Sequence, residues 1–182
     1  MSLTRRKLLL NIVSGFSVVG LIALLFPFLK GILPTLKQKE LMEIDVSAIK
    51  DGEAKTVRWK GRNVLIVKRN PDSISKHSSQ LKSLIDPFSS NSSQPEFAKG
   101  HGRSDRDNYL VVYSYCTLLS CELKRLQTET KQGYVFAGFF CPCDGSRYDT
   151  SGRVIAGSAA KYNLSIPNYE HVSESRIRLT GV

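Results

Sequence analysis

The chain has 182 residues, of which 41% are hydrophobic and 23% are charged, and these are ordinary proportions for a globular protein. The length favours one folded domain with an additional segment. Of the net charge of +10, four positive charges flank the first apolar run and the remaining +6 is dispersed, and no cluster of Lys and Arg interleaves with aromatic residues as a nucleic-acid-binding surface requires. Composition and charge therefore argue against nucleic acid as a partner.

An uncharged apolar run lies near the N-terminus. Leu8 to Leu29 spans 22 residues, which as a helix would be about 33 Å long and would cross a hydrocarbon core of about 30 Å. The run is too long for the apolar part of a signal peptide, and no A-x-A cleavage site follows it. Arg5, Arg6 and Lys7 precede it, so the positive-inside rule places the N-terminus in the cytoplasm. We therefore expect a retained single-pass anchor.

The residues before the apolar run also suggest an export route. The stretch TRRKLLL resembles a twin-arginine signal. We accordingly expect four regions in a bacterial inner membrane protein: a cytoplasmic N-terminus at 1–7, a transmembrane anchor at 8–29, a tether at 30–40 and a periplasmic domain at 41–182. All four cysteines lie in the last region, where an oxidising compartment permits disulfides.

The exported region is rich in short β-prone runs bounded by turn residues. We expect strands at 41–46, 55–61, 62–70, 108–115, 133–140, 152–157 and 176–181, with the second and third forming a hairpin at Gly61. The segment 71–107 is rich in Ser, Asn, Asp and Gly, and we expect a long loop region there with one short helix near His77 to Ile85. The pattern predicts an antiparallel all-β domain of about 140 residues.

Two pairs of cysteines each follow an expected strand. The loop CTLLSC covers 116–121 and comes after the strand at 108–115, and the loop CPCDGS covers 141–146 and comes after the strand at 133–140. We expect the two loops to meet at one end of the sheet. Such loops usually bind a metal or form a disulfide. Their spacings, C-x4-C and C-x-C, differ from the paired C-x2-C of zinc ribbons.

The twin-arginine-like start and five further segments in order along the chain carry a family resemblance: VVGLIALLFPF, VRWKGRNVLIVKRN, DPFSSNSSQPEFAKGHGRS, YLVVYSYCTLLSC and FFCPCDGSRYDTSGRV. Together they resemble the Rieske iron–sulfur proteins, and most of all the Rieske subunit of quinol–cytochrome c reductase, the cytochrome bc complex. The resemblance implies an antiparallel Rieske-like sandwich with two cysteine loops and a 2Fe–2S cluster. It also implies electron transfer in a respiratory membrane from a quinone site, with cytochrome b and a c-type cytochrome as partners.

The family patterns of the two loops are C-T-H-L-G-C and C-P-C-H-G-S. The resemblance implies that Cys116 and Cys141 bind one iron and that Cys121 and Cys143 form a disulfide between the loops. The histidine of each pattern binds the other iron. Three further positions match the family: Ser146 and Tyr148, which hydrogen-bond the cluster and raise its potential, and Leu119, which faces the quinone site.

Both histidine positions carry another residue in this chain. Leu118 and Asp144 stand there, and leucine has no donor atom, while a carboxylate is a poor substitute for imidazole. Ser120 replaces the glycine of the first pattern, and GSAA at 157–160 replaces a proline-containing GPAP loop. The chain's three histidines, His77, His101 and His171, lie outside both loops.

Three interpretations of the loops remain open. Cys116 and Cys141 bind metal if a modified cluster forms, and an all-cysteine 2Fe–2S centre would have a potential near about −400 mV, which makes it a poor quinol oxidant. In a second interpretation, the chain is a cluster-free structural or assembly subunit of a respiratory complex and has no cofactor. In a third, it is a relic without a role or an engineered ligand variant.

The state of Cys116 and Cys141 without iron is a separate question. Two thiols placed to share one metal need only a modest inward shift to form a disulfide, and the periplasm supplies oxidant. We therefore expect a second bridge, Cys116–Cys141, in place of the metal. The alternative is one disulfide and two free buried thiols.

Overall fold

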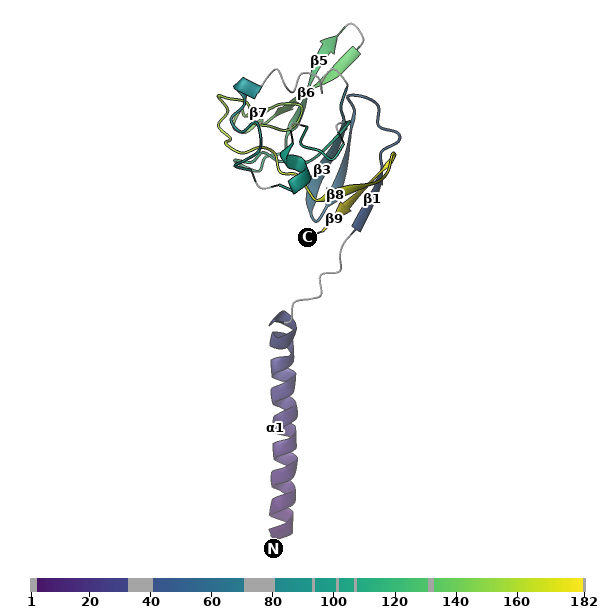
Figure 1. Cartoon of the computed structure of the whole chain (residues 1–182). Coiled ribbons are helices and arrows are strands. Elements are labelled where there is room, and N and C mark those ends of the chain that lie inside the picture. Colours follow the sequence, from purple (N-terminus) through teal and green to yellow (C-terminus); the bar gives the residue numbers. More distant parts are fainter. Residues whose placement is uncertain are drawn as a thin grey trace. The chain divides into compact units, whose positions relative to one another are not determined.

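The computed structural model describes residues 3–32, 41–70, 81–92, 94–100, 102–106, 108–130 and 133–181. The chain divides into two compact units, one over Met1–Lys39 and one over Glu40–Val182 (Figure 1). The first unit contains a long helix, and the second contains all the strands found among the described residues.

Helix α1 (Leu3–Ile32) has 30 residues, none of them acidic. Its segment Arg5–Pro27 is long and apolar enough to cross a membrane, and its large apolar side chains are exposed. Ser14 and Ser17 donate their hydroxyl groups to backbone carbonyls of the preceding turn, at 3.0 and 2.9 Å, so both hydroxyls are satisfied within the helix. The helix includes the whole expected anchor.

The expected tether at 30–40 is described only in part. Residues 30–32 continue helix α1, and residues 33–40 lie outside the described residues.

Three antiparallel sheets of three strands each make up the second unit in the part of the chain that the structure describes. Their orders are β1 (Leu41–Asp45), β9 (Arg176–Thr180), β8 (Tyr169–Ser173); β2 (Ala54–Trp59), β3 (Arg62–Lys68), β4 (Tyr109–Tyr113); and β5 (Lys124–Thr130), β6 (Gly133–Phe140), β7 (Arg147–Tyr148). Two 3₁₀ helices, η1 (Leu81–Ser83) and η2 (Glu96–Lys99), lie between β3 and β4. The prediction of an antiparallel all-β domain with one N-terminal helix is confirmed.

The hairpin of β2 and β3 has the turn that the sequence predicts. Trp59 pairs with Arg62, and the two residues between them, Lys60 and Gly61, both have positive φ, at 47° and 77°. Two central residues of positive φ make a type I′ turn, whose twist matches that of the flanking strands. The turn therefore fixes the register of β2 on β3.

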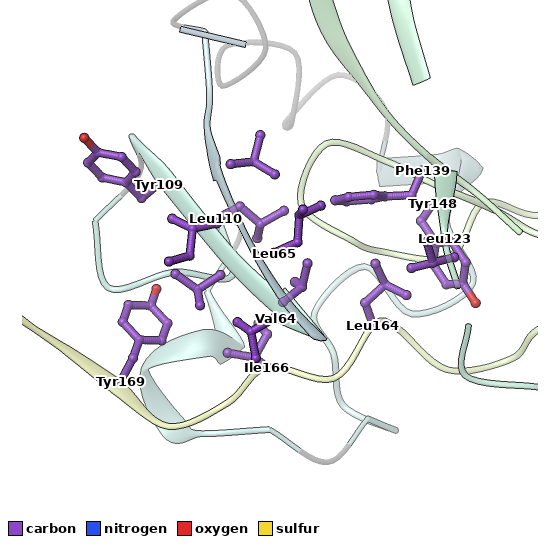
Figure 2. Packing of buried hydrophobic residues seen from close by; sticks show 14 of the residues in the cluster. Val64, Leu65, Tyr109, Leu110, Leu123, Phe139, Tyr148, Leu164, Ile166 and Tyr169 are labelled. Carbon is purple, nitrogen blue, oxygen red and sulfur yellow. The ribbon is translucent and has the colours of Figure 1, made fainter. Parts of the chain in front are cut away.

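Strands β3 and β4 form the centre of the core. Four consecutive residues of each, 64–67 and 109–112, are buried, which is typical of strands covered on both faces. Figure 2 shows this centre with Tyr148 at one side of it. Cys116 and Cys141 belong to the same buried cluster, so the cysteine loops are built directly on the core.

One expected strand is wrong. Instead of a strand, the segment 152–157 makes single bridges, with Tyr148 and Leu84 as the partners. The reason lies in the turn before it, where Asp149 Oδ1 accepts the backbone N–H groups of two following residues, among them Arg153 at 2.8 Å. A chain bent by such a side-chain-capped turn does not run alongside a neighbour for long.

Strands β5 and β8 were not expected from the sequence. Their sequences, KRLQTET and YEHVS, are mostly polar, and they are stabilised by pairing with β6 and β9 rather than by apolar patterning of their own. Of the short helix expected near 77–85, the structure describes the 3₁₀ turn η1, while residues 71–80 lie outside the described residues.

Two buried arginines hold the segment that follows the second cysteine loop. The Arg103 side chain donates to the backbone carbonyls of Gly152 and Leu164 at 2.9 and 2.6 Å. Burial lowers the pKa of Arg103 to about 10, against the opposing effect of Asp149. Arg153 Nη2 lies 2.7 Å from Asp149 Oδ2, and both side chains are buried.

A histidine on β8 is enclosed by aromatic rings. The His171 ring centroid lies 6.1 Å from that of Tyr109 and 5.9 Å from that of Tyr169. Both ring nitrogens are buried and have no hydrogen-bond partner among the described residues. Burial lowers the pKa of His171 below its usual value of 6.5, and Arg106 lowers it further, against smaller opposite effects of nearby acids.

We predict that His171 makes the domain less stable in mild acid. Because its pKa is lower in the folded state, its neutral form is favoured by folding, so stability is lost as the pH falls below about 6.5. Urea unfolding of the full chain in detergent at about pH 8 and about pH 5 should show a larger loss for wild type than for His171→Phe. Equal losses in the two proteins would contradict the assignment.

Candidate metal centre

The two cysteine loops have matching backbone geometry. In the first, the Cys116 carbonyl accepts the N–H of Ser120, and in the second the Cys141 carbonyl accepts the N–H of Gly145, each at 3.0 Å. Ser120 and Gly145 both have positive φ, at 56° and 73°. A left-handed conformation favours glycine, which explains why a glycine suits the first loop and why Ser120 is strained there.

A disulfide between Cys121 and Cys143 joins the two loops. It is the pairing that the resemblance implies. Cys116 and Cys141, by contrast, are free and buried. The second disulfide expected between them is therefore wrong for this structure. Cys116 Sγ is instead hydrogen-bonded to a side chain of the opposite loop.

That side chain is Asp144, which stands at a histidine position of the family pattern. Cys116 Sγ donates to Asp144 Oδ2 at 3.0 Å, and Asp144 Oδ1 accepts the backbone N–H of Ser146 at 2.8 Å. Desolvation acts to raise the pKa of Asp144, but hydrogen bonds from Cys116, Ser146 and Cys141 outweigh it and lower the pKa to about 2. Desolvation, followed by the contact with Asp144, raises the pKa of Cys141 to about 11.

Three donor atoms thus converge across the loops. The two free sulfurs and a carboxylate oxygen of Asp144 all lie within 4.8 Å of one another. A second such group, Cys121, Cys141 and Cys143, contains the disulfide and so cannot act as a ligand set while that bond is intact. The first group is the better candidate for holding a metal.

The hydroxyl of Tyr148 contacts the first loop beside this group. Its hydroxyl lies 3.3 Å from Cys116 Sγ and 3.1 Å from Thr117 Oγ1, and its side chain is fully buried. Desolvation, with the Cys116 contact, raises the pKa of Tyr148 far above its ordinary value, so the phenol stays protonated. Close approach of β6 to this tyrosine requires glycine, because a Cβ at Gly138 would collide with the Tyr148 carbonyl oxygen.

The remaining residues singled out by the resemblance make other contacts or face outward. Ser146 Oγ accepts the backbone N–H of Ala160, so it ties the second loop to the GSAA segment. Leu118 and Leu119 are exposed, at 50% and 58%, and form an apolar tip of the first loop. Leu118 accordingly supplies neither a donor atom nor core packing at its histidine position.

Sequence reasoning missed a hollow beside the first loop. A cavity of about 630 Å³ is lined by residues in or just before the first loop, namely Tyr113, Tyr115, Cys116, Thr117 and Ser120, together with residues far away in the chain, namely Gly61, Arg62, Asn91, Ser92, Tyr162, Asn163 and Ser165. Thr117 Oγ1 donates to the Tyr162 carbonyl at 2.8 Å at its edge. No spacing in the sequence signals this cavity, because its lining comes from loops joined only by folding.

Similarity to known proteins covers nearly the whole chain. No family model matches it. The ubiquinol–cytochrome c reductase iron–sulfur subunit of Rickettsia felis is 35% identical over 179 residues, which are 97% of this chain and 93% of that protein. The chain belongs to this family of Rieske iron–sulfur subunits.

Other members of the Rieske family are similarly related. The protein of the same name from Allochromatium vinosum is 31% identical over 95% of this chain and 86% of its own length. The cytochrome b-c1 complex subunit Rieske-1, mitochondrial, of Nicotiana tabacum is 36% identical over 75% of this chain and 46% of that protein.

We predict that the Cys121–Cys143 disulfide stabilises the domain measurably. Its cysteines are 22 residues apart in sequence, and closing a loop of that length is worth about 3 kcal/mol in the chain-entropy model. Replacing both by alanine should lower the free energy of unfolding in urea by about that amount. Leu118→Ala, which changes an exposed side chain of the first cysteine loop, serves as control and should leave the free energy of unfolding unchanged. A loss no larger than that of the control would contradict the prediction.

Proposed function

We propose that the chain is a membrane-anchored Rieske-fold subunit of a cytochrome bc1-type respiratory complex that carries no two-histidine 2Fe–2S cluster and acts as a structural or assembly subunit. Relatives named as iron–sulfur subunits of ubiquinol–cytochrome c reductase support the place in the complex. Helix α1 supports the anchor. The expected partners are cytochrome b and c-type cytochrome subunits.

The donor set of the two loops carries this proposal. A Rieske cluster needs two cysteines on one iron and two histidines on the other. Cys116 and Cys141 can supply the first pair, but Leu118 has no donor atom and Asp144 offers a hard carboxylate oxygen. One iron of the pair would lack its ligands, so the residues present do not fit the cluster.

An all-cysteine cluster is also disfavoured. It would need four thiolates, and two of the four cysteines are joined in the Cys121–Cys143 disulfide. Even with that bond broken, the centre would have a potential near about −400 mV, against about −150 to +300 mV for the two-histidine type. Electron transfer from quinol would then be strongly uphill, so a modified cluster does not restore the family's activity.

We predict that the isolated chain has no Rieske cluster. After dithionite reduction, we expect no rhombic Rieske signal in electron paramagnetic resonance and far fewer than two irons per chain, because the second iron has no ligands. Two irons per chain together with that signal would contradict the proposal.

Co-purification with partner subunits distinguishes a structural subunit of the complex from a relic without a role. An affinity-tagged chain, solubilised in mild detergent from its own membranes, should retain cytochrome b haem. A matched variant lacking residues 1–32, and so helix α1, should lose it. A full chain that retains no cytochrome would leave the structural role without support and favour the relic.

The orientation in the membrane forms a further part of the proposal. Arg5, Arg6 and Lys7 precede the apolar segment, and the positive-inside rule keeps them in the cytoplasm, so the β unit lies in the periplasm of a bacterial inner membrane. The twin-arginine-like start is consistent with export of a folded domain. The domain boundaries proposed from the sequence, 1–7, 8–29, 30–40 and 41–182, follow this orientation.

We predict that a cysteine placed on the β unit reacts from outside. Ser173 is exposed on β8, so Ser173→Cys should be labelled by a membrane-impermeant maleimide in intact spheroplasts, because the native free thiols are buried. Thr4→Cys, on the other side of the apolar segment, should be labelled only after detergent is added. The reverse pattern would overturn the orientation.

A further inference from the structure

We propose that Cys116, Cys141 and Asp144 bind a single divalent cation of the zinc class in the place of the cluster. This inference rests on the proposed absence of a two-iron centre. In this proposal, Asp144, which stands at a histidine position of the family pattern, is itself a metal ligand. The fourth tetrahedral position is left to a water molecule, as in zinc sites with three protein ligands.

The distances fit such an ion. Zinc binds thiolate sulfur at about 2.3 Å and carboxylate oxygen at about 2.0–2.2 Å, so ligands on one tetrahedral ion lie about 3.6–3.8 Å apart. Cys116 Sγ and Asp144 Oδ2 are 3.0 Å apart, and all three donor atoms lie within 4.8 Å of one another. Small shifts of side chains therefore bring the three atoms onto one ion, without movement of the loops.

The chemistry of the donor set selects the ion. Two thiolates exclude magnesium and calcium, which prefer all-oxygen sites, and zinc accepts sulfur and oxygen ligands together. Binding forms two metal–sulfur bonds and one metal–oxygen bond, and the two thiol protons leave to solvent. The proton that Cys116 shares with Asp144 lies between two of the donor atoms and would be among those released.

Neighbouring groups already orient the ligands. The Ser146 N–H holds Asp144 Oδ1, which leaves Oδ2 facing Cys116. The Tyr148 hydroxyl lies against Cys116 Sγ. Groups that hydrogen-bond metal ligands in this way fix their orientation and strengthen binding. A metal ion bound in this way would also keep the neighbouring thiols of Cys116 and Cys141 from oxidising. It would join the two loops at a second point beside the disulfide.

Cobalt substitution tests the proposal, because Co²⁺ takes tetrahedral zinc sites and reports thiolate ligands optically. The full chain, purified in detergent without reductant and stripped of metal, is titrated with Co²⁺ under anaerobic conditions. We expect a near-ultraviolet thiolate-to-cobalt band that saturates at one equivalent and disappears when Zn²⁺ is added. Cys141→Ser should abolish the band, and Asp144→Asn should weaken binding by at least about tenfold. Leu118→Ala, in the first loop beside Cys116 and without a donor atom, should bind as wild type does.

Alkylation of the unreduced, denatured apoprotein distinguishes a failure of the metal site from a failure of the proposed function. Two alkylatable thiols without a cobalt band would overturn the metal site and leave the proposed function intact. No alkylatable thiol would also overturn the site, since the ligands would then be oxidised. Binding unchanged in Asp144→Asn would remove the aspartate from the ligand set and contradict the proposal. Two irons per chain with a Rieske signal in the protein as purified would overturn both proposals together.

Discussion

The Cys121–Cys143 disulfide holds two loops from distant parts of the chain against each other, and the geometry of the site depends on that bond. Each loop follows a core strand and contributes one buried thiol. Because the disulfide fixes one point of contact, the two loops bring Cys116 and Cys141 close together. The bond therefore holds the two loops together independently of the residues at the histidine positions of the family pattern.

The fold is similarly independent of the site. Its centre is the pair β3 and β4, whose continuous apolar runs are buried. The segment after the second loop is held by the buried Arg153–Asp149 pair and by the Arg103 side chain on backbone carbonyls. None of these contacts involves a metal ligand. These contacts stabilise the scaffold independently of the residues at the histidine positions, in line with the separation of fold from function.

Much of the fold could be predicted because the strands that form the core are apolar runs with clear turns, as at β3 and its turn at Gly61. Strands β5 and β8 could not, since they are polar and gain their stability from pairing. The segment 152–157 looks apolar enough for a strand but is bent by the turn at Asp149. Apolar patterning therefore succeeds where burial decides the structure, and it fails where pairing with another strand or a side-chain-capped turn decides it.

The site was predictable to a different degree. The cysteine spacing and the family resemblance identify the loops and the disulfide pairing, but they do not tell where Asp144 points. Its contact with Cys116 joins residues 28 apart in sequence, and it was this contact that made the expectation of a second disulfide wrong. Contacts between side chains of two loops depend on the loops' relative placement, which spacing alone does not encode.

The most direct test of the account is native mass spectrometry of the full chain as purified from its own membranes. The account predicts a polypeptide with one disulfide and a mass increment of no more than one divalent metal ion, because one set of ligands converges among the described residues while that disulfide is intact. A mass increment of two irons and two inorganic sulfides, lost together on acidification, would contradict it.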